Sequence, residues 1–185
     1  MKPFCWSSLN RQQVGAYAEY FVKMQFTMFG FQVYETEVDD RGVDFVVRHD
    51  RSDFIEIQVK SVRGTGYVFM QKEKFKLRDR LWLALALFEE GRYPDLYLVP
   101  SMSWRFADGV FCSRDYQKPG QTSDPEWGIN VSKKNLRRLQ EFRFDCRVDD
   151  LKQADSPNQP PLQTPTSGTP AADAPVAPPS GAAGR

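Results

Sequence analysis

The chain has 185 residues, of which 41% are hydrophobic, and its formal net charge at pH 7 is +1. This length and apolar content predict one globular domain with a packed core and argue against two domains. The weak net charge excludes a protein whose whole surface is strongly basic, and the longest apolar run, Leu81 to Phe88, is too short to cross a bilayer.

Residues with redox or metal chemistry are few. Cys5, Cys112 and Cys146 are far apart and show no C-x-x-C spacing, so neither a zinc site nor a disulfide framework is indicated. The N-terminus lacks the apolar stretch of a signal peptide, and reduced thiols fit a soluble, cytoplasmic protein. His49 is the only histidine, which disfavours catalytic triads and histidine metal sites.

The first predicted element is a helix that follows Asn10. Asn10 and Gln13 have the spacing of a capping box, and apolar residues recur at helical intervals from there to Gly30. Gly15 and Glu19 are four residues apart and therefore lie on one face of this helix, whose small residues let it approach a sheet. We expect Glu19 to reach that sheet, the alternative being a glutamate on the surface.

Four strands are predicted next, joined as an antiparallel meander. The first run mixes aromatic and β-branched residues, a polar turn follows it, and Gly-Thr-Gly precedes the last run. The predicted strands cover residues 31–38, 43–47, 54–62 and 67–70, with the turn at 39–42.

The second half of the chain is predicted to complete a mixed sheet and to cover it. The run 81–88 is apolar almost throughout, and we interpret it as a strand, although periodicity alone does not separate a strand from a buried helical turn. Another strand is predicted over 95–99. A helix over 132–142, capped by Ser132, is expected to cover the other side of the sheet. Residues 106–127 contain too many turn residues for an assignment.

From about Gln153 the composition changes to Pro, Ala, Ser, Gly, Thr and Gln without apolar periodicity, which cannot offset the entropy of ordering. We predict a folded domain over 1–152 and a disordered tail over 153–185. The three charged residues of the tail have a net charge of −1. Because the whole chain has a net charge of +1, the net charge of the domain is +2. Two basic runs in the domain are either solvated faces or phosphate contacts: Lys72, Lys74, Lys76, Arg78 and Arg80, then Lys133, Lys134, Arg137 and Arg138.

The hairpin formed by the second and third predicted strands carries the pattern that best indicates chemistry. Side chains alternate along a strand over 54–62, so Gln58 and Lys60 share one face and the other face is apolar. Asp44 lies in the preceding apolar run, where a carboxylate is costly unless a metal, or an ion pair with Lys60 or Arg41, compensates it. A carboxylate, an amide and an ammonium then converge, which suits hydrolysis of a phosphodiester.

Asp44 with Gln58-Val59-Lys60 resembles the motif of the PD-(D/E)XK nuclease superfamily, in the variant that has glutamine in place of the second acid. The likeness spans roughly Asn10 to Tyr97 and is greatest to the Mrr-like restriction, Holliday-junction-resolvase-like and intron-associated endonuclease groups. It implies a restriction-endonuclease-like α/β fold, a mixed β-sheet flanked by helices. It also implies a metal-dependent endonuclease that hydrolyses DNA, and nucleases of this kind often act as homodimers.

The resemblance implies a role for each residue of the motif. Asp44, Gln58, the backbone carbonyl of Val59, and Glu19 of the first helix would hold Mg²⁺ or Mn²⁺. Lys60 would orient or activate the attacking water and stabilise the charge that develops at the phosphate. The predicted catalytic residues are thus Asp44, Gln58, Lys60 and Glu19. Since a neutral amide binds a divalent cation more weakly than a carboxylate does, the alternative is an inactive nuclease-fold module that binds nucleic acid or a protein partner.

Neighbouring polar residues have competing interpretations. Glu56 either supplies charge to the metal from one step along the strand or pairs with an arginine such as Arg48 or Arg63. Asp39 and Asp40 are a carboxylate pair next to the motif, but aspartates before a glycine are ordinary turn residues, and we interpret them so. No sequence element that reads the 2′-hydroxyl is identifiable, so RNA stays an alternative substrate to DNA.

Overall fold

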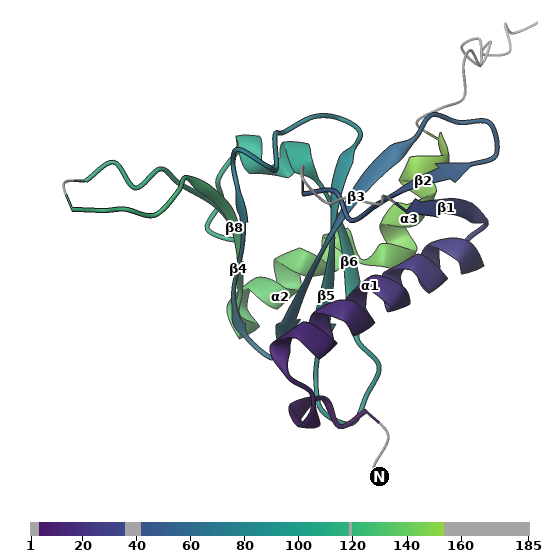
Figure 1. Ribbon diagram of the computed structural model, residues 1–185, viewed down its shortest axis with the longest axis horizontal. Helices are drawn as coiled ribbons and strands as arrows, with labels where there is room; N and C mark the ends of the chain where they lie inside the picture. Colours follow the sequence, from purple (N-terminus) through teal and green to yellow (C-terminus); the bar gives the residue numbers. More distant parts are fainter. Residues whose placement is uncertain (1–3, 36–41, 119, 154–185) are drawn as a thin grey trace, which may run out of the picture.

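The computed structural model describes residues 4–35, 42–118 and 120–153 (Figure 1). The α-helices span Arg11–Met28 (α1), Lys133–Leu139 (α2) and Phe144–Gln153 (α3). The strands span Phe31–Glu35 (β1), Phe45–His49 (β2), Ile55–Arg63 (β3), Gly66–Gln71 (β4), Leu81–Phe88 (β5), Asp95–Pro100 (β6), Phe111–Arg114 (β7) and Glu126–Val131 (β8). Short 3₁₀ turns cover Trp6–Ser8, Ser101–Arg105 and Gln140–Phe142.

The strands form two sheets (Figure 1). The larger has the order β1-β2-β3-β5-β6, and its neighbours are antiparallel except for β3 and β5, which run parallel. The smaller has the order β4-β8-β7 and is antiparallel. Helices flank the larger sheet, so the predicted mixed α/β class is confirmed, and the smaller sheet is an addition to it.

The predicted four-stranded meander is wrong at its fourth strand. β1, β2 and β3 do follow one another in the larger sheet, but β4 turns away and pairs with β8. The place beside β3 is taken by β5, whose eight residues are all buried, because a strand that is apolar on both faces belongs in the interior of a sheet. The chain departs at Gly64, whose φ of +62° is open to glycine without steric cost.

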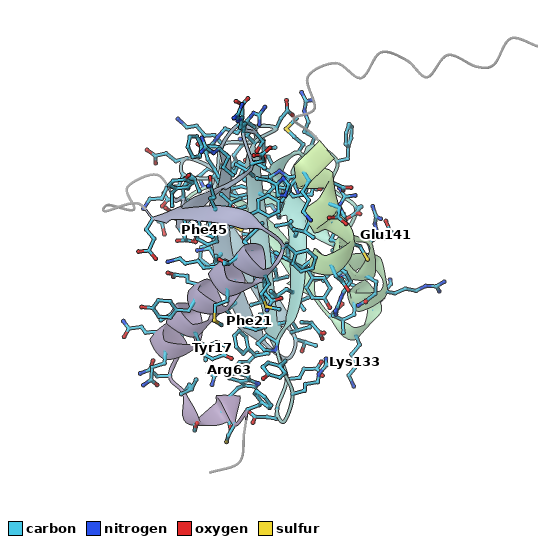
Figure 2. All side chains as sticks on the ribbon, turned by 90° about the vertical axis from the view of Figure 1, so that its right-hand side faces the viewer. Tyr17, Phe21, Phe45, Arg63, Lys133 and Glu141 are labelled. Atoms are coloured by element: carbon cyan, nitrogen blue, oxygen red, sulfur yellow. The ribbon has the colours of Figure 1, made fainter. Side chains whose placement is uncertain are left out.

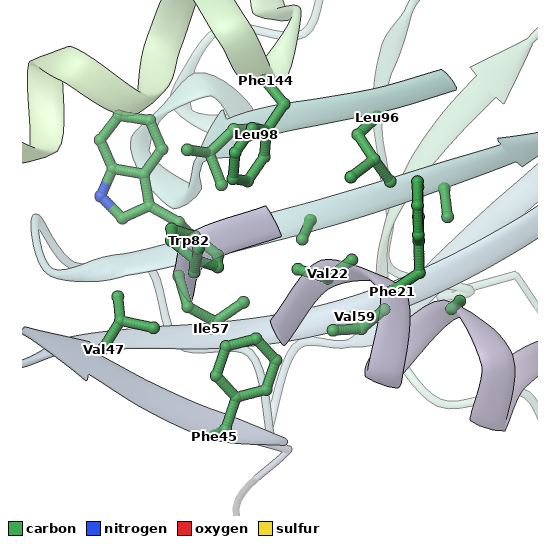
Figure 3. Packing of buried hydrophobic residues seen from close by; sticks show 14 of the residues in the cluster. Phe21, Val22, Phe45, Val47, Ile57, Val59, Trp82, Leu96, Leu98 and Phe144 are labelled. Atoms are coloured by element: carbon green, nitrogen blue, oxygen red, sulfur yellow. The ribbon is translucent and has the colours of Figure 1, made fainter. Parts of the chain in front are cut away.

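Alternate side chains of β5 enter two hydrophobic cores. Trp82 belongs to a core with α1 and α3, whereas its neighbour Leu83 belongs to a core with α2 and the smaller sheet. Figure 3 shows the first core, in which Phe21 of α1 and Phe144 of α3 meet side chains of the larger sheet. The larger sheet is therefore covered on both faces.

α1 begins where the capping box predicts. The Asn10 side chain accepts a hydrogen bond of 2.9 Å from the Gln13 backbone N–H, and the Gln13 side chain accepts one of 2.9 Å from the Asn10 N–H. Both bonds satisfy N–H groups that the start of a helix leaves without intrahelical partners. Ala18 is fully buried and Phe21 packs inward beside it, so the helix lies close to the sheet as predicted (Figure 2).

The helix predicted over 132–142 is confirmed in its position, but the observed helix, α2, is shorter than the predicted range. Ser132 caps it, because its side chain accepts a hydrogen bond from the Asn135 backbone N–H at 3.3 Å. α2 ends at Leu139, and a 3₁₀ turn completes the predicted range. Leu139 lies in the core that α1 does not share, so α2 covers the opposite face of the sheet as predicted.

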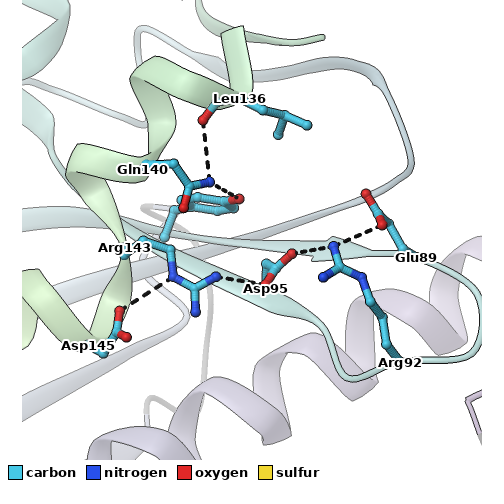
Figure 4. Close-up of polar contacts among 8 residues, drawn as sticks. Glu89, Arg92, Asp95, Leu136, Gln140, Arg143 and Asp145 are labelled. Atoms are coloured by element: carbon cyan, nitrogen blue, oxygen red, sulfur yellow. Dashed lines mark hydrogen bonds and ion pairs between the residues drawn. The ribbon is translucent and has the colours of Figure 1, made fainter. Parts of the chain in front are cut away.

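α3 was not predicted, although it packs in the same core as α1. The ring of Phe144 meets that of Phe26 edge to face, with centroids 4.9 Å apart. Before α3, Arg143 holds the chain to the larger sheet through an ion pair of 2.7 Å with Asp95, and it forms a second one of 3.4 Å with Asp145 (Figure 4). Residues 140–143 separate α2 from α3, which begins beyond the last residue of the helix predicted over 132–142.

Part of the prediction falls outside the described residues. This applies to the turn with Asp39 and Asp40, to residues 36–38 of the first predicted strand, and to the predicted tail from residue 154 onward. Within the described ranges, no helix has both the length and the apolar character needed to cross a membrane. β7 and the start of β8 occupy the stretch 106–127 that the sequence left unassigned.

Candidate active site

Asp44 lies one residue before β2, where the β2–β3 pairing ends. Its backbone N–H donates to the Ile57 carbonyl at 2.9 Å, and its Oδ2 accepts a hydrogen bond of 2.5 Å from the Val59 backbone N–H. β2 pairs with β3 only as far as Ile57, so the carboxylate of Asp44 takes up an N–H group that β2 does not reach. The carboxylate is thereby anchored at the residue between Gln58 and Lys60.

Gln58 projects from the face of β3 that does not pack against α1. Its side chain is buried, with 6% of the residue exposed, and within the described part of the chain its Oε1 has no hydrogen-bond partner. A buried oxygen left without a donor costs about 1 to 3 kcal/mol, and such groups are rare in native proteins unless an ion or water satisfies them. The Gln58 oxygen is therefore available to a ligand.

Gln58 and Lys60 line one pocket of about 290 Å³ between β3 and β4. The pocket exists because β4 leaves the larger sheet at the Gly64 turn, so that the two strands diverge instead of pairing. Its walls come from β3 (Gln58, Lys60, Ser61), from β4 (residues 67–71), from the start of α1 (Arg11), from the segment before β2 (Gly42) and from the turn after β4 (Lys74).

Lys60 is half-buried at the wall of this pocket. Its ammonium forms no ion pair and no hydrogen bond with any residue that the structure describes. The alternative in which Lys60 serves as a structural ion-pair partner of Asp44 is therefore not realised, and the other partner considered, Arg41, lies outside the described ranges. Lys60 instead presents its charge to the pocket.

Glu19 belongs to a stripe of α1 in which residues recur every four positions, from Arg11 through Gly15 to Lys23. At one end of the stripe Arg11 lines the pocket, and at the other the Lys23 ammonium lies 5.6 Å from the ring centroid of Phe45. Glu19 lies on this stripe between these two points, and its predicted role at the site stays a prediction. Its carboxylate has no hydrogen bond or ion pair within the described ranges and does not line the pocket, so no contact joins it to the other predicted site residues.

Val59 contributes to the site through its backbone. Its side chain is buried in the core beside α1, while its N–H holds Asp44. The N–H and the carbonyl of a strand residue point to the same side of the strand, so the Val59 carbonyl is directed to the side on which Asp44 lies. Its role as a metal ligand stays a prediction.

Glu56 does not share the pocket of Gln58 and Lys60. Its Oε2 accepts a hydrogen bond of 2.6 Å from Nε of Arg78, and the same guanidinium forms an ion pair with it through Nη2. Glu56 lines a separate hollow of about 750 Å³ together with Phe54. Pairing with an arginine is therefore confirmed, but the partner is Arg78 rather than one of the two that the sequence suggested.

Tyr67 closes the pocket on the β4 side. Its hydroxyl donates a hydrogen bond of 2.9 Å to the buried carboxylate of Glu126, which accepts a second one of 2.7 Å from Tyr116. Burial first, and then the hydrogen bond and charge of Glu126, raise the pKa of Tyr67 above its ordinary value of 10.0, so this phenol is a neutral donor and not a base. Gly128 lies under the ring, where a Cβ would collide with it.

The oxygen atoms near Gln58 form a small donor set for a hard cation. Within the described residues, no group of three or more His, Cys, Asp or Glu side chains is placed to hold a metal ion. Mg²⁺ needs fewer, because it keeps several waters and is held by one or two carboxylates together with substrate phosphates. The anchored carboxylate of Asp44 and the unsatisfied oxygen of Gln58 are hard oxygen donors of the kind that such a cation takes.

Among the pocket residues that were not predicted as site residues, three come from outside β3 and β4, namely Arg11, Gly42 and Lys74. The signals were present but indirect: Arg11 precedes Glu19 by two helical steps of four residues, Lys74 belongs to a basic run, and Gly42 ends the predicted turn. The sequence does not show that the start of a helix, a turn and a strand meet at one place, because those contacts join residues far apart in the chain.

Comparisons of this chain with known proteins include a distant structural likeness. No protein-family model matches the chain, and no curated protein matches it. Among solved structures, the chain is similar to one described as the structure of a bacterial homing endonuclease, I-Ssp6803I, with a TM-score of 0.47 and 15% sequence identity. The match covers 78% of this chain and 93% of the other. At that identity the likeness is one of shape, and the chemistry of the site rests on the residues and contacts given above.

Proposed function

We propose that this protein is a metal-dependent endonuclease that hydrolyses phosphodiester bonds of DNA. The observation that carries the proposal is the buried, unsatisfied Gln58 oxygen, which shares a pocket with Lys60, while the Asp44 carboxylate is anchored at Val59, the residue between them. Hard oxygen ligands beside an ammonium that faces the same space combine the two requirements of phosphodiester hydrolysis, a site for a divalent cation and a group that positions water.

In this proposal Asp44 and Gln58 hold Mg²⁺ or Mn²⁺, with the Val59 carbonyl and Glu19 as further ligands. When bound, the ion polarises a non-bridging phosphate oxygen and offsets charge on the leaving oxygen. The Val59 N–H keeps the Asp44 carboxylate in one orientation before substrate arrives. Pre-orientation of this kind avoids a cost of reorganisation during the reaction.

Lys60 supplies the proton-bearing group of the site. Its ammonium carries three N–H donors, and within the described ranges none is committed to an ion pair. It holds the attacking water in line with the leaving oxygen and stabilises the negative charge that accumulates on the phosphate in the transition state. Tyr67, as a neutral donor already committed to Glu126, takes no part in proton removal.

A second function is favoured by the charge of the pocket. No aspartate or glutamate of the described ranges lines it, and Gln58 itself is neutral. If the site binds metal too weakly for catalysis, the protein is an inactive module that binds nucleic acid or a partner protein and cleaves neither. RNA in place of DNA is a further alternative, because no element that would read the 2′-hydroxyl is identifiable in the sequence.

A cleavage panel separates these functions. Duplex, branched and single-stranded DNA, and RNA of the same sequence, are incubated with wild type, Asp44→Ala and Lys60→Ala in Mg²⁺, in Mn²⁺ or in EDTA. We expect metal-dependent cleavage by wild type and, since general acid–base groups contribute about 10² to 10⁴ in rate, a loss of at least about a hundredfold in Lys60→Ala.

The control is Lys76→Ala, because Lys76 is exposed and lies outside the pocket. Circular dichroism and thermal unfolding check that each variant is folded. Equal cleavage with and without Lys60 contradicts the proposed role of that residue. Binding of nucleic acid by wild type without cleavage in either metal favours the second function.

A further inference from the structure

Three cationic side chains face the pocket from three different elements. Arg11 comes from the start of α1, Lys60 from β3 and Lys74 from the turn after β4. Within the described part of the chain, none of the three forms an ion pair, and no carboxylate lines the pocket. The pocket therefore carries positive charge that no residue of the described ranges neutralises, between walls that concentrate its field.

Three neighbouring basic residues, unlike the cations that line the pocket, form ion pairs within the protein. Lys72 forms an ion pair with Asp115 at 2.5 Å, and Arg80 forms one with Asp53 at 2.7 Å. Arg78, as described above, is held by Glu56. In the basic run after β4, three cations are thus paired within the protein; of the other two, Lys74 and Lys76, Lys74 is the one that lines the pocket.

Arg11 is placed at the pocket by contacts that anchor the N-terminal segment to β3. Arg63, at the end of β3, donates hydrogen bonds from Nη1 to the carbonyls of Trp6 at 3.2 Å and Leu9 at 3.0 Å. Arg63 follows Lys60 by three residues on the same strand. These bonds hold the chain immediately before α1 against the end of β3, so the first residue of the helix stays close to Lys60.

Lys74 is placed at the pocket by Gly42. A Cβ at Gly42 would lie 3.2 Å from Cβ of Lys74 and 3.1 Å from Nε2 of Gln58, so the stem of the lysine and the amide of the glutamine both approach this glycine closely. The turn that carries the lysine is closed by a backbone hydrogen bond of 3.1 Å from Lys74 to Gln71. Lys74 is therefore held beside Gln58 by backbone geometry.

We propose that Arg11 and Lys74 bind a phosphate of a nucleic-acid backbone in this pocket, next to the phosphate on which Lys60 acts. The proposal rests on the proposed function, because Gln58 and Lys60 line the same pocket. A phosphodiester anion neutralises the pocket, matches the fork of donors on a guanidinium, and brings the negative charge that a weakly held divalent cation needs. Arg11 and Lys74 are thus assigned as substrate-binding residues that the sequence motif does not include.

The test measures binding separately from cleavage. A fluorescein-labelled DNA oligonucleotide is titrated with protein in EDTA at several salt concentrations, and anisotropy reports the fraction bound. We expect Arg11→Ala and Lys74→Ala each to weaken binding about three- to tenfold, and to reduce the slope of log affinity against log salt by roughly 0.7 to 0.9 for each contact removed. Lys76→Ala and Arg105→Ala, which remove exposed cations outside the pocket, are expected to bind as wild type does.

A second oligonucleotide with methylphosphonate linkages identifies the recognised group. Because it lacks backbone charge, wild type and the Arg11→Ala/Lys74→Ala double variant are expected to bind it equally. A double variant that binds charged DNA as wild type does overturns the proposal. So does a nucleoside 5′-monophosphate that displaces the oligonucleotide at the affinity of the oligonucleotide itself, since the pocket then takes a terminal phosphate.

The two proposals fail in different ways. If binding in EDTA depends on Arg11 and Lys74 but wild type cleaves nothing in Mg²⁺ or Mn²⁺, the phosphate pocket stands and the endonuclease proposal is refuted. If wild type cleaves DNA but the double variant binds it with unchanged affinity and salt slope, the endonuclease proposal stands and the phosphate assignment is refuted.

Discussion

The backbone N–H of Val59 donates a hydrogen bond of 2.5 Å to Oδ2 of Asp44, at the point along β3 that β2 no longer reaches. One carboxylate therefore closes a gap in the backbone hydrogen bonding of β3, and it does so at the residue that follows Gln58, whose side-chain oxygen is unsatisfied. A variant that removes the whole side chain changes both properties. Substitutions at this position must separate the hydrogen bond from the charge.

Asp44→Asn keeps an oxygen that accepts from Val59 but removes the negative charge, so we expect near-native stability with loss of metal binding. Asp44→Ala also leaves the Val59 N–H without its acceptor, which lowers the free energy of unfolding by about 1 to 3 kcal/mol. Urea denaturation measures the free energy of unfolding, and calorimetric titration with Mn²⁺ measures metal binding. An Asn variant that binds Mn²⁺ with wild-type affinity shows that Asp44 is not a ligand.

Gln58→Leu is expected to stabilise the fold while weakening metal binding. The substitution removes a buried oxygen without a described donor, whose cost is about 1 to 3 kcal/mol, and replaces it with apolar volume. Gln58→Glu is the opposite change, and its added charge is expected to lower the Mg²⁺ concentration at which cleavage is half-maximal. If Gln58→Leu lowers the free energy of unfolding instead, the oxygen has a partner in the folded protein and the pocket is not poised for a ligand.

Gly42→Ala tests the close approach that holds Lys74 beside Gln58. The residue has a φ of +69°, and its added Cβ would meet both neighbours. Gly109→Ala is the matched control, since its φ is +86° and nothing lies within 4 Å of an added Cβ. Left-handed strain, about 1 to 2 kcal/mol, affects both variants. We expect Gly42→Ala to lose more stability than Gly109→Ala does. We also expect Gly42→Ala, but not Gly109→Ala, to bind DNA more weakly than wild type. Equal effects of the two substitutions would show that small shifts of Lys74 and Gln58 make room for the added Cβ.

The raised pKa of Tyr67 predicts a loss of stability in alkaline solution. Its folded-state pKa lies above the unfolded value of 10.0, so its contribution is fully present below about pH 10 and is lost as the pH rises towards the folded value. Unfolding free energies of wild type and Tyr67→Phe, measured by urea denaturation from neutral to alkaline pH, are expected to converge above that pH. A constant difference between the two curves would show that the pKa of Tyr67 is not raised in the folded protein.

Features that depend on residues a few positions apart were determined by the sequence. The Asn10 and Gln13 capping box placed the start of α1, because both hydrogen bonds join residues three apart. The run from Leu81 to Phe88 had no polar face, which indicated a strand buried on both sides. Alternation along β3 placed Gln58 and Lys60 on one face, and the structure has them in one pocket. Their assigned chemistry stays a proposal.

Contacts between distant segments were decided only by the tertiary structure. β4 could pair locally with β3, yet β5 takes that position because its two apolar faces need burial that only the centre of the sheet supplies. The divergence of β3 and β4 then creates the pocket and brings Arg11 and Lys74 to it, from residues whose separation in the chain hides their proximity. The same long-range packing brings Arg78 to Glu56, and it places Glu19 where no contact joins it to the other predicted site residues. Side-chain partners depend on the tertiary fold and not on local sequence pattern.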